Sequence, residues 1–217
     1  MIPSAMFANA CALFILFFSA LPADAAVDAN LCGPLENAFG PFDYRTARPA
    51  DIAIVERNHF DEGVATLRRT MTAKFGGDID YTLRAFPNHH RALFTMITLA
   101  EREKTTRPAG ARYTVECYLE RATRFRPDDA MVRAIAGGYM IKLGKHDEAL
   151  VALDAALALG TANANVYYNV GLSYFELKEY EKSLAAAHRA YAAGFPLEGL
   201  RQKLERAGKW VPAPAQK

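Results

Sequence analysis

The sequence predicts an all-α fold in which helical hairpins stack into a solenoid, and three observations point to this class. Two consecutive windows, residues 130–163 and 164–197, superimpose so that Gly137 meets Gly171 and Ala156 meets Ala190. Each window contains an apolar-periodic helix, a short break, and a second helix with alanines on one face. Hydrophobic residues make up 51% of the chain, which excludes a disordered protein. Because one hairpin cannot bury its apolar stripe alone, tandem hairpins are expected to stack.

Length and charge narrow the class of partner. The 217 residues suffice for one compact domain or a short solenoid. The formal net charge of +2 is spread over both halves of the chain. We therefore expect neither a nucleic-acid partner nor binding to a membrane surface.

Residues 1–26 are predicted to be a signal peptide. The run from Met6 to Leu21 carries no charge, is short for a membrane span, and is followed by small residues that suit signal peptidase. Cleavage is expected near Ala25 or Ala26, which places the mature protein outside the cytoplasm, in the periplasm, with no membrane span. An uncleaved anchor is the alternative, because no Lys or Arg precedes the run.

Cleavage would remove Cys11 and leave Cys32 and Cys117. Two cysteines in an exported protein predict a disulfide. The alternative is a buried thiol at Cys117 and an inert thiol at Cys32. Lipidation of Cys32 is not expected, because Leu31 occupies the position where a small residue is required.

The segment that follows the signal peptide is predicted to be extended. Gly-Pro pairs punctuate residues 27–50, with one helical turn expected around residues 35–39. Phe39, Phe42 and Tyr44 are expected to anchor this segment onto the helices.

Two helices are expected to complete an N-terminal cap over residues 27–89. The first covers residues 61–74 and ends at Gly76-Gly77. Asp78 is expected to cap the second, which Pro87 terminates.

The residues on either side of the two windows, 90–129 and 198–217, complete the predicted architecture. Residues 90–129 form a degenerate repeat with an insertion of about six residues around 106–111, which solenoids accommodate in loops. Residues 198–217 form a capping helix and a tail, with Trp210 folded back onto the helices.

These windows resemble the tetratricopeptide repeat, a family with a period of about 34 residues. In residues 164–197 the resemblance rests on Tyr167, Val170, Gly171, Tyr174, Tyr180 and Ala190, with Ser183 and Ala187 departing from the pattern. In residues 130–163 it rests on Gly137, Gly144, Asp147, Glu148, Ala149 and Ala156, with Arg133 and Thr161 departing. The resemblance implies a right-handed α-solenoid of about three repeats, from residue 90 onward, that acts as a non-enzymatic interaction scaffold.

In this family the first helices of successive repeats line a concave groove that binds a peptide or a partner helix. Carried over by position, the groove residues are Arg91, Phe94, Thr95, Thr98, Arg102, Met131, Ala134, Ile135, Gly138, Lys142, Tyr168, Asn169, Leu172 and Phe175. The implied partner is a protein or peptide of the cell envelope, with apolar anchors and some acidic character. Alternatively, the chain is a structural subunit whose groove is filled in cis by residues 27–87.

No constellation of catalytic residues emerges from the sequence. The only serines after residue 26 are Ser173 and Ser183, with no base placed beside them. His89 and His90 lack metal-ligand spacing and are expected to begin a helix, while His59, His146 and His188 are expected at the surface. We therefore expect no catalytic residue, metal, cofactor or small-molecule substrate. An enzyme of unfamiliar type is the remaining alternative.

Overall fold

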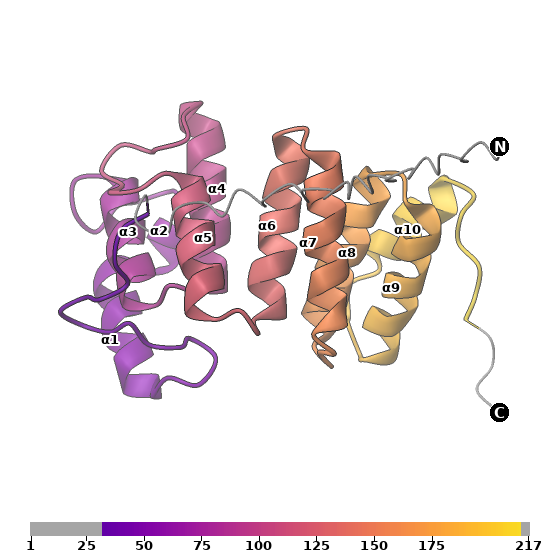
Figure 1. Cartoon of the computed structure of the whole chain (residues 1–217), viewed down its shortest axis with the longest axis horizontal. Helices are drawn as coiled ribbons and strands as arrows, with labels where there is room; N and C mark the ends of the chain where they lie inside the picture. Colours follow the sequence, from indigo (N-terminus) through magenta and orange to yellow (C-terminus); the bar gives the residue numbers. More distant parts are fainter. Residues whose placement is uncertain (1–31, 214–217) are drawn as a thin grey trace, which may run out of the picture.

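The computed structural model describes residues 32–213, so the predicted signal peptide lies outside the described residues. Within this range the chain forms ten α-helices and no strand. Paired helices follow one another along the long axis of the molecule in chain order (Figure 1). The predicted all-α helical-repeat solenoid is confirmed.

The helices are α1 (Pro49–His59), α2 (Glu62–Ala65), α3 (Phe75–Ala85), α4 (His90–Glu103), α5 (Val115–Phe125), α6 (Ala130–Lys142), α7 (His146–Ala158), α8 (Ala164–Glu176), α9 (Tyr180–Ala192) and α10 (Gly199–Arg206). Three hairpins, α4–α5, α6–α7 and α8–α9, form the stack, and α10 packs against the last of them. We call α4, α6 and α8 the first-helix row. In α4–α5 the connection spans residues 104–114, where an insertion was expected.

Small residues allow the paired helices to approach closely. A Cβ added to Gly137 of α6 would lie 2.8 Å from two side-chain atoms of Leu153 in α7. In the next hairpin a Cβ added to Gly171 would lie 2.5 Å from Leu200 of α10. Ala156 is fully buried. The recurrent glycines and alanines of the sequence are therefore contacts between helices.

Ser183 departs from the family pattern, yet the structure accounts for it. Its side chain is fully buried, and Oγ donates a hydrogen bond of 2.8 Å to the carbonyl of Gly171. The hydroxyl therefore occupies a small-residue position without leaving a buried polar group unsatisfied.

The N-terminal third differs from the prediction. Residues 35–39 form no helix, and α1 had no counterpart among the predicted helices. The expected helix over residues 61–74 is a single turn, α2, after which Leu67 adopts a positive φ of 53°. Residues 66–74 form a loop.

Asp78 does not cap a helix. It lies inside α3, is fully buried, and accepts hydrogen bonds from the backbone N–H groups of Met71 and Thr72. Gly76, which was expected to end a helix, lies in the first turn of this one, and a Cβ there would lie 2.6 Å from the carbonyl oxygen of Ala109. Long-range contacts, rather than local helix signals, define this region.

The predicted anchors and the predicted disulfide are confirmed. Phe39, Phe42 and Tyr44 pack around the buried ring of Phe86. Cys32 and Cys117 form a disulfide with a Cα–Cα distance of 5.0 Å. We call residues 32–45, which this bond fixes to α5, the strap.

Arginines of α5 reinforce the attachment of the strap. Arg121, only 1% exposed, donates hydrogen bonds to the carbonyls of Cys32, Gly33 and Pro34. Arg124 donates to the carbonyl of Gly33 at 2.9 Å. At the other end of the molecule Trp210 folds back against His188 and Tyr191, as predicted.

Substitutions of two adjacent glycines in α6 test the close approach of α6 to α7. We expect Gly137→Ala to lower the free energy of unfolding by about 1–3 kcal/mol, because its methyl group would overlap Leu153. Gly138→Ala is the control, since its Cβ would meet only Ser173 Oγ, at 3.8 Å. We expect the control to be neutral or stabilising by up to about 1 kcal/mol. Urea denaturation followed by circular dichroism measures both, and equal effects would contradict the packing.

Candidate functional site

The predicted groove residues of α4 lie mostly on an accessible face. Arg91, Phe94, Thr98 and Arg102 are exposed, with Phe94 41% exposed, while Thr95 is buried. An exposed aromatic ring on a helix face is the kind of apolar group that a partner could cover.

The segment around α2 lies alongside this face of α4. Thr95 Oγ1 donates a hydrogen bond of 3.1 Å to the carbonyl of Ala65, and Arg102 donates one of 3.0 Å to that of Leu67. Arg91 forms an ion pair of 2.7 Å with Glu62. A hollow of about 280 Å³ remains between this segment and Phe94.

The middle of the predicted groove belongs to the core. Met131 is 7% exposed, Ala134 4% and Ile135 1%, so these residues offer no accessible surface. The reason is that α6 has a neighbour on each side in the first-helix row, α4 and α8. Lys142 is exposed, and its Nζ lies 2.6 Å from Glu101 of α4.

The groove residues of α8 contact the C-terminal cap. Tyr168 stacks on Phe195 with ring centroids 3.9 Å apart, and Leu172 and Phe175 pack against the cluster around α10. Asn169 donates to the backbone carbonyl of Asn165 at 2.8 Å. The most exposed part of the predicted groove is therefore its α4 end together with Lys142, while the groove residues of α8 are half-buried.

A cluster of polar side chains fixes the start of α4 relative to the start of α6. We call it the polar node: Asp43, Asn88, His90 and Asp129. Asp129, 2% exposed, caps α6 by accepting the backbone N–H groups of Met131 and Val132. It also accepts hydrogen bonds from His90 at 2.9 Å and Asn88 at 2.9 Å.

The node also holds the strap. Asn88 donates to Asp43 at 2.7 Å and accepts the backbone N–H of Tyr44 at 3.0 Å. Arg45 pairs with Asp43 at 2.8 Å. Burial works to raise the pKa of Asp43, but the hydrogen bonds from Arg45 and Asn88 outweigh it and lower the pKa to about 2.

The histidines play structural roles. His89 caps α4, since its Nδ1 accepts the backbone N–H of Ala92, which leaves Nε2 to donate to Glu56 at 3.1 Å. Burial lowers the pKa of His89, which favours this neutral tautomer. Among residues 32–213 no group of three or more His, Cys, Asp or Glu side chains could hold a metal ion.

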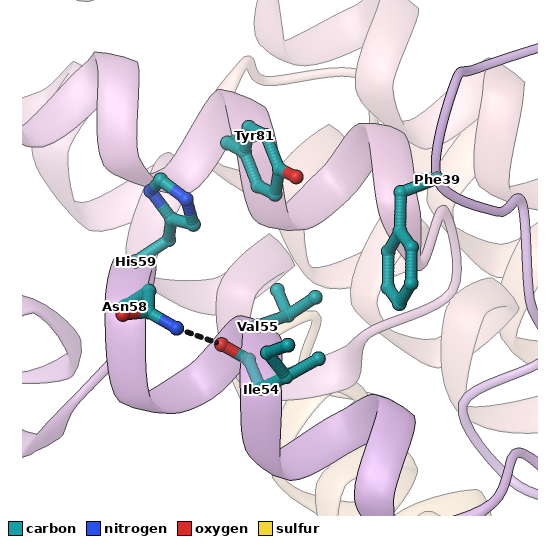
Figure 2. Close-up of a pocket in the computed structure, with 6 residues that line it drawn as sticks. All are labelled: Phe39, Ile54, Val55, Asn58, His59 and Tyr81. Carbon is teal, nitrogen blue, oxygen red and sulfur yellow. Dashed lines mark hydrogen bonds between the residues drawn. The ribbon is translucent and has the colours of Figure 1, made fainter.

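A pocket with a volume of about 200 Å³ is lined by Phe39 and by residues of α1 and α3. Figure 2 shows the side chains that line it. His59 stacks on Tyr81 there, with centroids 3.8 Å apart, and its Nδ1 lies 3.8 Å from Oδ1 of the buried Asp78. The His59 side chain is 24% exposed and is therefore half-buried at the surface. The contacts of His59 with Tyr81 and Asp78 join α1 to α3.

The stack and its first-helix row define a helical-repeat protein. The sequence model of a family described as TPR repeat matches residues 140–178, which contain α7 and α8. This match identifies a tetratricopeptide repeat within the stack, in agreement with the predicted resemblance. No curated protein and no solved structure matches it. None of the helices among residues 32–213 combines the length and apolar character that crossing a bilayer requires.

The polar node generates a pH prediction. The folded-state pKa of Asp43 lies near 2, below the ordinary 3.8, so its stabilising contribution is present above pH 3.8 and is lost as pH falls toward 2. We expect Asp43→Asn to cost about 1–3 kcal/mol at pH 7. The difference from wild type should shrink across that acidic window, as urea denaturation at stepped pH would show.

The exposed Asp147 of α7 supplies the control for this series. Asp147→Asn should cost less than Asp43→Asn at pH 7. If the cost of Asp43→Asn stays constant down to pH 2, the node does not hold this carboxylate ionised.

Proposed function

We propose that this protein is a non-enzymatic adaptor of the cell envelope that binds a segment of another protein on its first-helix row. Tetratricopeptide repeats generally mediate binding between proteins, and the match over α7 and α8 is the observation that carries the proposal. The fold offers a stack of hairpins whose edge residues stay accessible at α4.

The disulfide supports an exported location. Disulfides persist in oxidising compartments such as the bacterial periplasm and are rare in the cytoplasm. The Cys32–Cys117 bond fixes the strap to the stack, so the fold makes structural use of oxidation. The uncharged run Met6 to Leu21 supports the same proposal.

The binding surface that we propose centres on Phe94. Its ring borders the hollow beside α2, and Thr98 lies one turn further along α4. Arg91, Arg102 and Lys142 give this end a basic edge, although Arg91 and Lys142 already pair with acidic neighbours. A partner with an apolar anchor flanked by acidic residues would fit.

A second candidate is a structural subunit whose groove is filled in cis. The hydrogen bonds from Thr95 and Arg102 to residues 65 and 67 favour it, because the chain itself covers one side of α4. The two candidates differ in whether an external protein depends on Phe94.

Recovery of partners from envelope extracts separates the candidates. We expect Phe94→Asp to lose the proteins that co-purify with wild type, because a charge would replace the apolar ring. Val151→Asp is the control, since Val151 is 71% exposed on α7, outside the first-helix row. Partners retained by Phe94→Asp, or lost equally from both variants, would contradict binding at the surface around Phe94.

If the protein is exported and oxidised, the number of free thiols per chain can be predicted. Protein isolated from the periplasmic fraction and denatured without reductant should contain no free thiol, because Cys11 is removed with the signal peptide and the other two cysteines are paired. An intact N-terminus would add one thiol. In the chain-entropy model this disulfide, which spans 85 residues of sequence, stabilises by on the order of 4 kcal/mol. Two free thiols in the mature chain would exclude the bond.

A further inference from the structure

A third hollow lies between α5, α6 and the start of α7. This cleft has a volume of about 430 Å³, larger than the hollow beside Phe94. Leu119, Ala136, Met140 and Leu143 give it an apolar wall. Sequence patterns gave no indication of it.

The next junction of the stack shows how such a space is closed from within. There Tyr174 of α8, 1% exposed, donates its hydroxyl to Asp154 of α7. Lys182 of α9 lies 2.9 Å from both carboxylate oxygens of Asp154 and 5.4 Å from the Tyr174 ring centroid. An aromatic ring thus fills the junction, and a cation closes it against a carboxylate.

The equivalent positions one repeat earlier lack these groups. Met140 replaces Tyr174, Glu148 replaces Lys182, and Glu120 replaces Asp154. Without a hydroxyl or a cation opposite, Glu120 pairs with Arg124 at 2.7 Å and Glu148 with Lys145 at 3.3 Å. A hydrogen bond from the Tyr139 hydroxyl to Glu116 links α6 to α5, but no aromatic ring or cation occupies the positions that correspond to Tyr174 and Lys182, and the cleft stays open.

The charges around the cleft are unbalanced. Glu116, Glu120 and Glu148 line it together with only two cations, Arg124 and Lys145. Glu116 accepts the Tyr139 hydroxyl at 2.7 Å, and within residues 32–213 it has no ion-pair partner. The cleft therefore combines an apolar wall with one excess negative charge at its rim.

We propose that this cleft docks a helical segment of a partner protein that presents an aromatic side chain and a Lys or Arg on one face. The partner supplies in trans the two groups that Tyr174 and Lys182 supply at the next junction. The aromatic ring covers Met140 and the apolar wall, and the cation pairs with the rim carboxylates. Residues four apart on a helix lie side by side, so this spacing suits the pair. The surface is separate from the one around Phe94.

A designed helical peptide with Tyr and Lys four residues apart is the probe. Two matched peptides carry Glu in place of the Lys, or Ala in place of the Tyr. We expect saturable binding of the first peptide by fluorescence anisotropy and binding at least about tenfold weaker for each of the others. In protein labelled at methionine methyl groups, the shift should fall on Met140 and not on Met71 or Met96.

Variants of the protein locate the site. Met140→Tyr with Glu148→Lys rebuilds the internal bridge, so we expect it to weaken peptide binding about tenfold and to raise the urea midpoint. Glu116→Gln, a mild change at the rim, should weaken only the Lys peptide. Phe94→Asp should leave peptide binding unchanged, which separates this site from the proposed groove.

Four outcomes would each overturn the proposal. One is the absence of saturable binding by the Tyr–Lys peptide. Another is equal binding of the Glu-substituted peptide. The third is unchanged binding to both Glu116→Gln and the double variant, and the fourth is loss of binding in Phe94→Asp.

Discussion

The close approach of α6 to α7, with Gly137 against Leu153, is the contact on which the rest of the structure depends. It lets the middle hairpin present apolar surface to α4 and α8 at once, and one continuous core runs from Phe60 to Tyr174. In such stacks stability is a sum over repeats and the junctions between them. The side-chain packing at each junction between hairpins therefore determines the stability of the stack. It also determines which surface stays exposed for partners.

Two features besides helices α1–α3 fix the N-terminal end of the stack. The strap is bonded to α5 through Cys32 and crosses to the polar node, where Asn88 joins Asp43 to Asp129. Because Asp129 also caps α6, the same carboxylate fixes the strap, the start of α4 and the start of α6. The strap thus connects the disulfide on α5 to the start of α6 in the middle of the stack.

The sequence predicted the features that local patterns encode. Glycines and alanines that recur at the repeat spacing indicated the close contacts between helices. The presence of Cys32 and Cys117 in a chain predicted to be exported indicated the disulfide. The loop before α3 could not be predicted, because it depends on the burial of Asp78, which bonds to the loop backbone, and on the long-range approach of Ala109 to Gly76. Burial of Ile135 and the contact of Tyr168 with Phe195 depend on neighbouring helices, so position in a repeat alone did not separate groove from core.

Native-state hydrogen exchange of the oxidised protein tests most directly whether the hairpins depend on one another. The account predicts that amides of α6 and α8 open together in a single transition as denaturant is added, with α2 and α10 exchanging earlier. Protection of α8 and α9 that persists in denaturant where α6 and α7 already exchange freely would contradict it. A hairpin with that behaviour would bury its apolar stripe without its neighbour.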